Sequence, residues 1–240
     1  MYKVIILAGG LGTRLSEETE LKPKPMVSIG DIPILLHIMQ IFDSQIETEF
    51  LIATGYRSEV IDDYLKSPTF LATGLKAKSI FTGDNTGTAG RIKKIFDIFP
   101  DEKMFVTYGD GLANINLLEL IKFHQKHKRI ATVTAVRPAA RYGRLYIENG
   151  EVLRFAEKMQ ADEGWINGGF FLIEREVINY IKSDADMLEI EPLAAVTLDR
   201  QLMAFQHFGF WQPMDTLRER NELDKLARSS VSPWFQIDKP

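Results

Sequence analysis

Short apolar runs alternate with segments of helical period through the first half of this 240-residue chain, and this alternation restricts its fold more than any other feature. The runs that we expect to be strands are Lys3–Ala8, Glu49–Ala53, Lys76–Phe81, Met104–Thr107 and Ile130–Val136. Short apolar strands connected by helices are typical of a parallel sheet. The sequence therefore predicts an α/β fold with a Rossmann-like, mixed and mostly parallel sheet flanked by helices.

Two helix starts and a change of pattern complete this prediction. Pro33 suits the first turn of a helix over residues 33–43, and Asn116 with Glu119 three residues later forms an N-cap pattern. From about Arg137 the sequence predicts an antiparallel or mixed β region that elaborates the same domain. Its expected strands are 143–148, 151–157, 165–173 and 201–207, and its expected helical segments are 175–181, 189–199 and 216–227.

Composition excludes several classes of function. The chain has no cysteine, which removes disulfides, thiolate metal sites and thiol nucleophiles. No apolar run approaches the roughly 20 residues of a membrane span, and no signal peptide precedes the first strand, so we expect a cytoplasmic protein with no membrane partner. A net charge of −4 argues against nucleic-acid binding but permits a small anionic ligand in a local basic pocket.

The strongest functional signal is the loop LAGGLGTRL at residues 7–15, directly after the first expected strand. Glycines let backbone N–H groups approach a phosphate closely, and Arg14 adds a fixed positive charge. The loop lacks the GK[ST] of a Walker motif, and Leu15 stands where a dinucleotide fingerprint needs Gly or Ala. We interpret it as a phosphate-binding loop. The alternative, a tight strand-to-helix turn, requires neither Arg14 nor so many glycines.

The segment KPKPM at residues 22–26 carries two lysines, each followed by a proline that stiffens the backbone. It follows the glycine loop closely enough to fold back over the same edge of the sheet, where a lysine could neutralise a phosphoryl group. The alternative is a solvated basic turn.

Two aspartates indicate a metal. Asp110, in YGDG, ends an expected strand, and Asp215, in FWQPMDT, lies in a stretch too apolar for an ordinary surface turn. Carboxylates at such positions bind hard divalent cations, so the pair favours a shared Mg²⁺. The alternative for Asp110 is a structural Asp–Gly turn.

Other polar residues give weaker signals. Thr88 suits an N-cap with Arg91 in the first turn of the same helix, which is an arrangement that favours anions. The segments EKM at 157–159 and NGG at 167–169 could bind hydroxyls and a phosphate, or form ordinary turns. His124 and His127 lie three residues apart on an expected helix, and we expect a surface pair rather than a metal site.

These motifs occur together in an order that resembles the sugar-phosphate nucleotidylyltransferases and, among them, the glucose-1-phosphate cytidylyltransferases. The matching segments are LAGGLGTRLSEET at 7–19, KPKPM at 22–26, TGDNTGTAGR at 82–91, TYGDG at 107–111, EK at 157–158, NGGFF at 167–171, EPL at 191–193 and GFWQPMDTLR at 209–218. The resemblance covers nearly the whole chain. It implies a single nucleotidyltransferase domain over residues 1–240, with a nucleotide-binding part at 1–136 and a sugar-phosphate-binding part at 137–240.

The resemblance also implies a reaction. The substrates would be CTP and a sugar 1-phosphate, closest to α-D-glucose 1-phosphate, with Mg²⁺ as cofactor and a homo-oligomer as the assembly. The sugar phosphate would attack the α-phosphorus in line, and pyrophosphate would leave. The implied catalytic residues are Arg14, Lys24 and Asp110, and the metal ligands are Asp110 and Asp215. The implied nucleotide-binding residues are Leu7, Ala8, Gly9, Gly10, Leu11, Gly12, Thr13, Thr86, Arg91 and Gly109, and Glu157, Lys158, Asn167 and Gly168 would bind the sugar phosphate.

Three departures from the family pattern leave alternatives open. The connection from Tyr64 to Thr82 is short, Met159 replaces a proline, and Ala89–Gly90 replaces paired glycines. Another nucleotide or a different phosphate acceptor therefore stays possible for the same reaction. A catalytically silent sugar-nucleotide-binding subunit is a second alternative. Such a subunit would not need a phosphoryl lysine together with two metal carboxylates.

Overall fold

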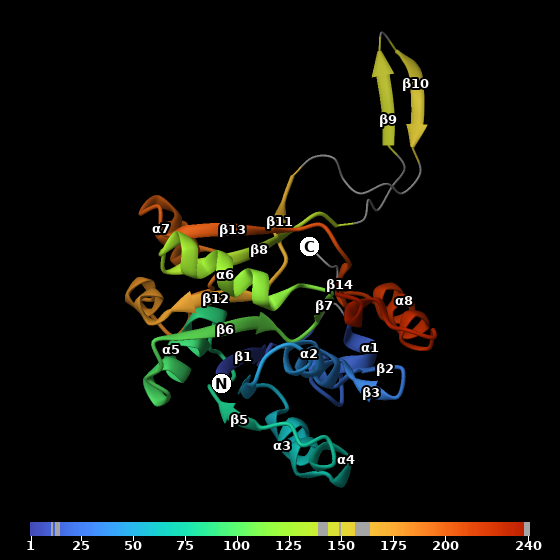
Figure 1. The fold of residues 1–240 in the computed structure, drawn as a ribbon. Coiled ribbons are helices and arrows are strands. Elements are labelled where there is room, and N and C mark those ends of the chain that lie inside the picture. The colour runs from blue at the N-terminus through green and yellow to red at the C-terminus, as the bar shows by residue number, and fades with distance from the viewer. Residues whose placement is uncertain (11, 13–14, 139–143, 149, 157–163, 238–240) are drawn as a thin grey trace.

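The central sheet of the computed structural model contains eight strands in the order β11-β8-β12-β6-β1-β4-β5, with β13 also paired to β8 (Figure 1). The structure describes residues 1–10, 12, 15–138, 144–148, 150–156 and 164–237. The strands are β1 Tyr2–Ala8, β4 Thr48–Thr54, β5 Ala77–Phe81, β6 Lys103–Tyr108, β8 Ala131–Val136, β11 Ile166–Asn167, β12 Phe171–Glu174 and β13 Leu202–His207. The pairs β1–β4, β1–β6, β4–β5 and β8–β13 are parallel, whereas β11 and β12 pair with their neighbours in antiparallel orientation. The predicted mixed, mostly parallel sheet is confirmed.

Helices cover both faces of this sheet. They are α1 Ser16–Thr19, α2 Ile34–Asp43, α3 Ser58–Lys66, α4 Pro68–Leu71, α5 Thr88–Ile98, α6 Leu117–His127, α7 Glu191–Leu198 and α8 Leu217–Ala227, with the 3-10 helices η2 Lys24–Met26, η3 Arg175–Tyr180 and η4 Pro233–Phe235. The predicted cap at Asn116 is present, and Thr216, where the last helix was expected to begin, caps α8 through a capping box with Glu219.

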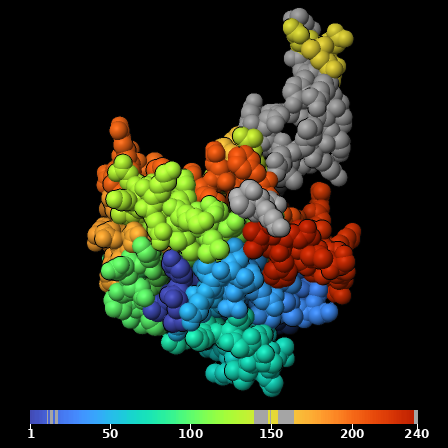
Figure 2. Space-filling model, viewed as in Figure 1, coloured from blue at the N-terminus to red at the C-terminus, as the bar shows by residue number. Residues whose placement is uncertain are grey.

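The central strand β1 shows why its sequence is a continuous apolar run. Val4 and Ile6 pack in a core with α2, α3 and α6, whereas Ile5 and Leu7 pack in a second core with α5, η3 and α7. Helices α2 and α6 are visible together on the first of these faces in Figure 2. Because both faces of β1 are covered, alternation of polar and apolar residues is absent.

In the part of the chain that the structure describes, three two-stranded sheets lie outside the central sheet. They pair β2 Ser28–Ile29 with β3 Ile32–Pro33, β7 Gly111–Ala113 with β14 Trp211–Pro213, and β9 Arg144–Glu148 with β10 Glu151–Ala156. The hairpin β9–β10 projects away from the central sheet (Figure 1), and Val152 and Leu153 near its turn are exposed.

One predicted strand in the C-terminal half differs from the structure. The expected strand 165–173 is broken between β11 and β12, because Gly169 and Phe170 adopt positive φ angles of 76° and 47°. Glycine is also needed at Gly168, where a Cβ would lie 2.6 Å from Val136 Cγ1 of the neighbouring strand β8. The segment expected to be helical at 175–181 is confirmed as helical, in the form of the 3-10 helix η3.

Three predictions about single residues are wrong. Pro33 precedes α2 instead of opening it, because its ψ of 148° is extended. Gly87, not Thr88, is the N-cap of α5, so Thr88 is already the first helical residue. His124 is buried rather than on the surface: its ring contacts Thr132 Oγ1 at 2.7 Å and Glu174 Oε1 at 3.0 Å, because this side of α6 faces β8 and β12.

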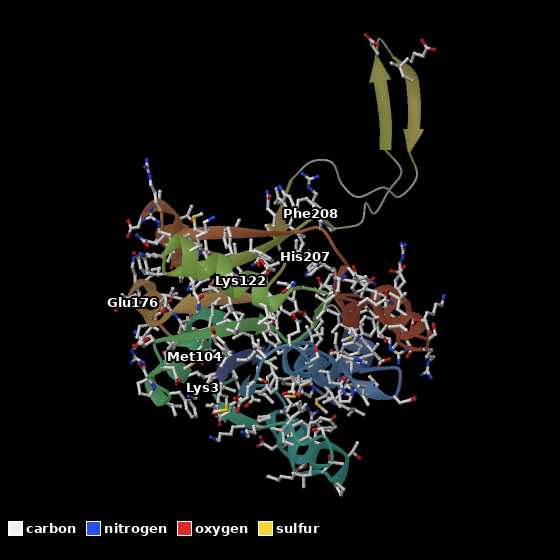
Figure 3. All side chains as sticks on the ribbon, in the orientation of Figure 1. Lys3, Met104, Lys122, Glu176, His207 and Phe208 are labelled. Atoms are coloured by element: carbon white, nitrogen blue, oxygen red, sulfur yellow. The ribbon has the colours of Figure 1, made fainter. Side chains whose placement is uncertain are left out.

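The strand order fixes where a ligand can bind. Strands β4 and β6 flank β1 on opposite sides: the chain that leaves β1 leads to β4 on one side, and the chain that leaves β6 leads to β8 on the other. Ligands of open α/β sheets bind at such a switch point. Lys3 and Met104, labelled in Figure 3, mark the opposite edge of the sheet, where β1 and β6 begin. None of the described helices combines the length and apolar character that crossing a bilayer requires.

Candidate active site

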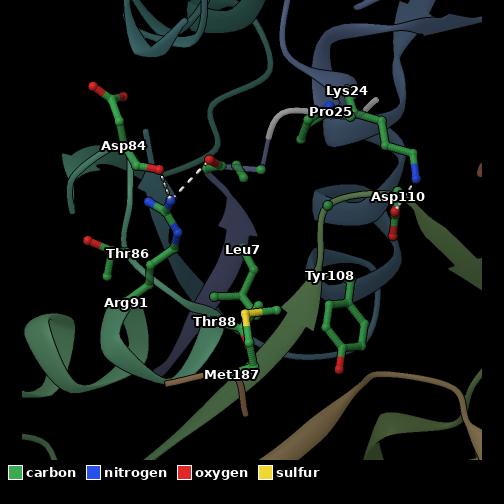
Figure 4. Close-up of a pocket in the computed structure, with 15 residues that line it drawn as sticks. Leu7, Lys24, Pro25, Asp84, Thr86, Thr88, Arg91, Tyr108, Asp110 and Met187 are labelled. Carbon is green, nitrogen blue, oxygen red and sulfur yellow. Dashed lines mark hydrogen bonds and ion pairs between the residues drawn. The ribbon is translucent and has the colours of Figure 1, made fainter. Parts of the chain in front are cut away.

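A cavity of about 430 Å³ lies at the carboxyl ends of β1 and β6, at the switch point (Figure 4). Its lining residues are Leu7, Ala8, Gly9, Gly10, Gly12, Lys24, Pro25, Asp84, Thr86, Thr88, Arg91, Tyr108, Gly109, Asp110 and Met187. They include every predicted nucleotide-binding residue that the structure describes. The predicted residues Leu11, Thr13 and Arg14 lie outside the described residues.

Two glycines of the loop serve different purposes. A Cβ at Gly9 would lie 2.1 Å from the guanidinium of Arg91, so only glycine permits this close packing. A Cβ at Gly10 would meet no described atom within 4 Å, and this residue is exposed. The backbone at Gly10 is therefore accessible to a ligand, as expected of a phosphate-binding loop.

Arg91 lies beneath the loop and is 3% exposed. Its guanidinium donates to the carbonyl oxygens of Gly9 at 3.0 Å and Thr54 at 2.8 Å and to Thr82 Oγ1 at 2.6 Å, and Figure 4 shows it among the residues that line the cavity, beside Asp84 and Thr86. Burial lowers the pKa of Arg91, an effect that the negative charge of Asp84 partly opposes. An arginine nevertheless stays protonated in proteins. Arg91 thus contributes a buried positive charge whose hydrogen bonds join the ends of β1 and β4.

Lys24 reaches the same cavity from η2. Its Nζ lies 2.5 Å from Asp110 Oδ2 and 2.7 Å from Asp215 Oδ1. The segment that carries Lys24 packs closely on the end of β6, because a Cβ at Gly109 would lie 2.7 Å from Pro25 Cγ. Burial opposes the charge of Lys24, but attraction and hydrogen bonds from both carboxylates outweigh it and raise its pKa. The predicted return of the KPKPM segment to the sheet edge is present.

The pairing of β14 with β7 places Asp215 next to Asp110. Pro213 of β14 pairs with Gly111 of β7, and the backbone N–H of Met214 donates to the carbonyl of Asp110 at 2.8 Å. Asp215 then precedes the capped start of α8, where its N–H donates to Glu219 at 2.9 Å. Asp110 and Asp215, which are far apart in sequence, are thereby both placed against the ammonium group of Lys24.

The two carboxylates fit a hard divalent cation. Both converge on a single cationic atom, and carboxylate oxygens are the ligands that such a cation prefers. Among the described residues, no group of three or more His, Cys, Asp or Glu side chains could hold a metal ion. A cation at Asp110 and Asp215 would therefore take its other ligands from substrate phosphates and water, which is how Mg²⁺ is usually bound.

The predicted sugar-phosphate side is only partly described. Glu157 and Lys158 lie outside the described residues. Asn167 donates from Nδ2 to the Tyr108 hydroxyl at 2.9 Å, and the carbonyl of Gly168 accepts from Trp211 Nε1 at 2.8 Å. Tyr108 lines the cavity and Trp211 belongs to the strand before Asp215, so the Asn167–Gly168 turn lies beside the predicted metal ligands.

Several cavity residues were not predicted from the sequence. Asp84, Tyr108 and Met187 line the cavity without such a prediction, whereas Thr88, which was expected in an arrangement with Arg91 that favours anions, lines it from the first turn of α5. The sequence could have indicated Tyr108, because it is the last residue of β6 and directly precedes the predicted site residues Gly109 and Asp110. Thr86, which was predicted, lines the cavity but donates its hydroxyl to the carbonyl of Thr82 at 2.7 Å.

Residues 3–214 match the family described as nucleotidyl transferase, and the chain belongs to that family. A glucose-1-phosphate cytidylyltransferase of Salmonella typhi is 42% identical to this chain, over 97% of this chain and 98% of its own length. A probable glucose-1-phosphate cytidylyltransferase of Bacillus subtilis is 38% identical over the same shares of the two chains. The predicted family resemblance is confirmed.

The fold is shared with a solved structure of lower identity. A putative glucose-1-phosphate thymidylyltransferase from Bacillus anthracis, crystallised in complex with a sucrose, superposes with a TM-score of 0.76 at 23% identity. The superposition covers 96% of this chain and 97% of the other. The common architecture therefore extends over almost the whole length of both proteins.

Proposed function

We propose that this protein transfers the cytidylyl group of CTP to α-D-glucose 1-phosphate, giving CDP-glucose and pyrophosphate. One observation carries the proposal: Lys24, Asp110 and Asp215 converge beside a glycine-lined cavity at the switch point of the sheet. Similarity to glucose-1-phosphate cytidylyltransferases over nearly the full chain supports the choice of substrates.

The proposed reaction brings two anions together. An oxygen of the sugar phosphate forms a bond to the α-phosphorus of CTP, the bond to the β-phosphate oxygen breaks, and pyrophosphate leaves with the electron pair. The protein contributes positioning and positive charge rather than a covalent step. We assign the nucleotide to the backbone at Leu7–Gly10, Gly12 and Gly109, with Arg91 beneath it, and the reacting phosphoryl oxygens to Lys24.

We assign Mg²⁺ to Asp110 and Asp215. When bound there, the ion would neutralise charge on the phosphates and orient them for displacement. Arg14, Thr86, Glu157, Lys158, Asn167 and Gly168, and the backbone of Leu11 and Thr13, keep the roles that the family resemblance implies. A cytoplasmic homo-oligomer also remains a prediction from that resemblance and from the sequence.

Pyrophosphate release tests the proposal. Purified protein with Mg²⁺ and glucose 1-phosphate is given CTP, UTP, dTTP, GTP or ATP in parallel, and we expect a clear preference for CTP. Lys24→Met should abolish most of the release. Lys22→Met is the matched control, because Lys22 belongs to the same segment but pairs with Glu18 at 3.7 Å instead of Asp110.

The same assay separates the alternatives. The connection from Tyr64 to Thr82, which is short for the family, holds α4 and β5 and favours a test of other nucleotides. Preference for a different nucleotide, or release only with another sugar phosphate, would move the assignment to that substrate. Silence with every nucleotide and acceptor would contradict catalysis and favour a binding subunit.

A further inference from the structure

A chain of hydrogen bonds crosses one wall of the cavity and centres on Tyr108. The Tyr108 hydroxyl donates to Glu189 Oε1 at 2.5 Å and accepts from Asn167 Nδ2 at 2.9 Å. The other carboxylate oxygen of Glu189 accepts from Thr88 Oγ1 at 2.9 Å. The four residues come from the start of α5, the end of β6, the end of β11 and the turn before α7.

The segment that carries Glu189 is fixed to α5 by its backbone. The N–H groups of Gly87 and Ala89 donate to the carbonyls of Asp184 at 2.8 Å and Asp186 at 3.1 Å. A Cβ at Gly87 would lie 2.2 Å from the oxygen of Asp186, so the two backbones touch directly. The carboxylate of Glu189 is therefore presented from a firmly held segment.

Tyr108 is equally well held by its ring. A Cβ at Gly169 would lie only 3.0 Å from Tyr108 Cδ2, so the absence of a side chain makes room for the ring. The φ of Gly169, +76°, is a second reason for glycine at this position. The ring of Phe171 packs against it edge to face at 6.1 Å between centroids. The turn that contains Asn167 and Gly168 is thus folded around Tyr108.

The direction of these bonds has a chemical consequence. The short contact of 2.5 Å to a carboxylate oxygen, Glu189 Oε1, shows where the Tyr108 hydroxyl places its proton. Tyr108 has one proton, and donating it to Glu189 leaves only its lone pairs for Asn167. The Nδ2 of Asn167 must therefore face Tyr108, while its Oδ1 accepts from the N–H of Gly169 at 2.9 Å.

We propose that Glu189 is a positioning residue: through Tyr108 it orients the amide of Asn167 so that the second N–H of Nδ2 meets a hydroxyl of the sugar phosphate. This inference rests on the proposed function, because it assigns the ligand of that amide. None of the bonds among the described residues uses the second N–H of Asn167 Nδ2. Glu189 also holds Thr88 and thereby ties the sugar side of the cavity to the helix on its nucleotide side.

Steady-state kinetics of four variants test the proposal. Glu189→Ala and Tyr108→Phe should each raise the KM for glucose 1-phosphate about 10-fold, while kcat and the KM for CTP change by less than about 3-fold. The double variant should be no worse than either single variant, because both act on Asn167 through one path. Glu189→Gln should raise the KM for glucose 1-phosphate much less than Glu189→Ala does, since its amide oxygen still accepts the proton of Tyr108.

A second tyrosine–carboxylate pair provides the control. Tyr180 donates to Asp199 at 2.8 Å on the surface, and neither residue lines the cavity. Tyr180→Phe and Asp199→Ala should leave all kinetic constants within 2-fold of those of the unmodified protein. Thermal melting of each variant establishes that it is folded.

Calorimetric titration of glucose 1-phosphate gives a readout that does not depend on turnover. Glu189→Ala should bind about 10-fold more weakly than the unmodified protein. An unchanged dissociation constant and KM, or single effects that multiply in the double variant, would overturn the positioning role. An unmodified protein that binds glucose 1-phosphate but is silent with all nucleotides would instead overturn the proposed function alone.

Discussion

Lys24 and Arg91 are the two cations among the described residues that line the cavity, and their surroundings differ. Arg91 is held by carbonyl and hydroxyl oxygens of Gly9, Thr54 and Thr82, and no ion pair to it is formed among the described residues. Lys24 is held by two carboxylates, Asp110 and Asp215. Neutral acceptors fixed by the sheet make Arg91 part of the framework. The carboxylates that hold Lys24 also suit a divalent cation, so such a cation could displace the Lys24 ammonium from them.

The difference assigns distinct tasks to the two residues. A cation bound at Asp110 and Asp215 would compete with Lys24 for the same oxygens, and the displaced ammonium would be free to face a phosphoryl group. Arg91 has no such competitor, because its acceptors are backbone carbonyls and a hydroxyl. We therefore expect Lys24 to matter for the reaction and Arg91 for the shape of the loop.

The largest expected effect concerns activity at Lys24. Lys24→Met should lower kcat about 10²- to 10³-fold, because one charge-stabilising donor of the transition state is lost. Asp110→Ala should lower kcat to a similar extent, and excess EDTA should stop the unmodified enzyme. Rates measured by pyrophosphate release within a few-fold of the unmodified protein would refute the catalytic role of Lys24.

The next effect concerns stability at Arg91. Arg91→Met should lower the free energy of unfolding by about 2–3 kcal/mol, because buried oxygen acceptors lose their donors. Urea unfolding measures the change, and Arg218→Met is the control, since Arg218 is 72% exposed in its pair with Glu222. Equal stability of the two variants would show that Arg91 is not part of the framework.

A smaller effect, on metal affinity, tests whether a divalent cation displaces Lys24 from Asp110 and Asp215 or whether the three residues only form a fixed ion pair. Without nucleotide, Lys24→Met should bind Mn²⁺ about 10-fold more tightly than the unmodified protein, because no ammonium competes for the carboxylates. Asp215→Asn should bind Mn²⁺ more weakly, and Lys22→Met should be unchanged. Calorimetry that finds equal affinities for Lys24→Met and the unmodified protein would contradict exchange at this position.

The smallest effect concerns pH, because neither cation changes its charge near neutrality. Burial lowers the pKa of His124, opposed by Glu174 and reinforced by Lys103, so the folded ring binds its proton less well than the unfolded chain. Stability should therefore fall as the pH drops below the unfolded value of about 6.5. His127, whose pKa is also lowered by burial, adds to this effect. His124→Gln should reduce the loss between pH 7.5 and 5.5, and an unchanged difference in urea midpoints would disprove it.

The sequence predicted the strands that are buried on both faces. The expected ranges of β1, β4, β6 and β8 lie within one residue of the observed bounds, because continuous apolar runs mark them clearly. The convergence of Asp110 and Lys24 was also predictable, since both follow elements that end at the same sheet edge.

Features set by contacts between distant segments could not be predicted. The pair β7–β14 has only three residues in each strand and thus no periodicity to detect. Arg91 was expected to touch the nucleotide, but its burial under Gly9 depends on the close approach of α5 to β1. Glu189 carries no local signal, because its role arises only where Tyr108, Thr88 and Asn167 meet.

The place of β12 in the central sheet has a consequence for synthesis of the protein. Strand β12 lies between β6 and β8 and pairs with both, although it follows both in the chain. When β8 has left the ribosome, β6 is paired with β1 on one side but still lacks β12 on the other, so an open strand edge remains exposed until Glu174 emerges. Polypeptides that end near residue 136 would keep that edge permanently, so we expect them to aggregate or to be retained by chaperones.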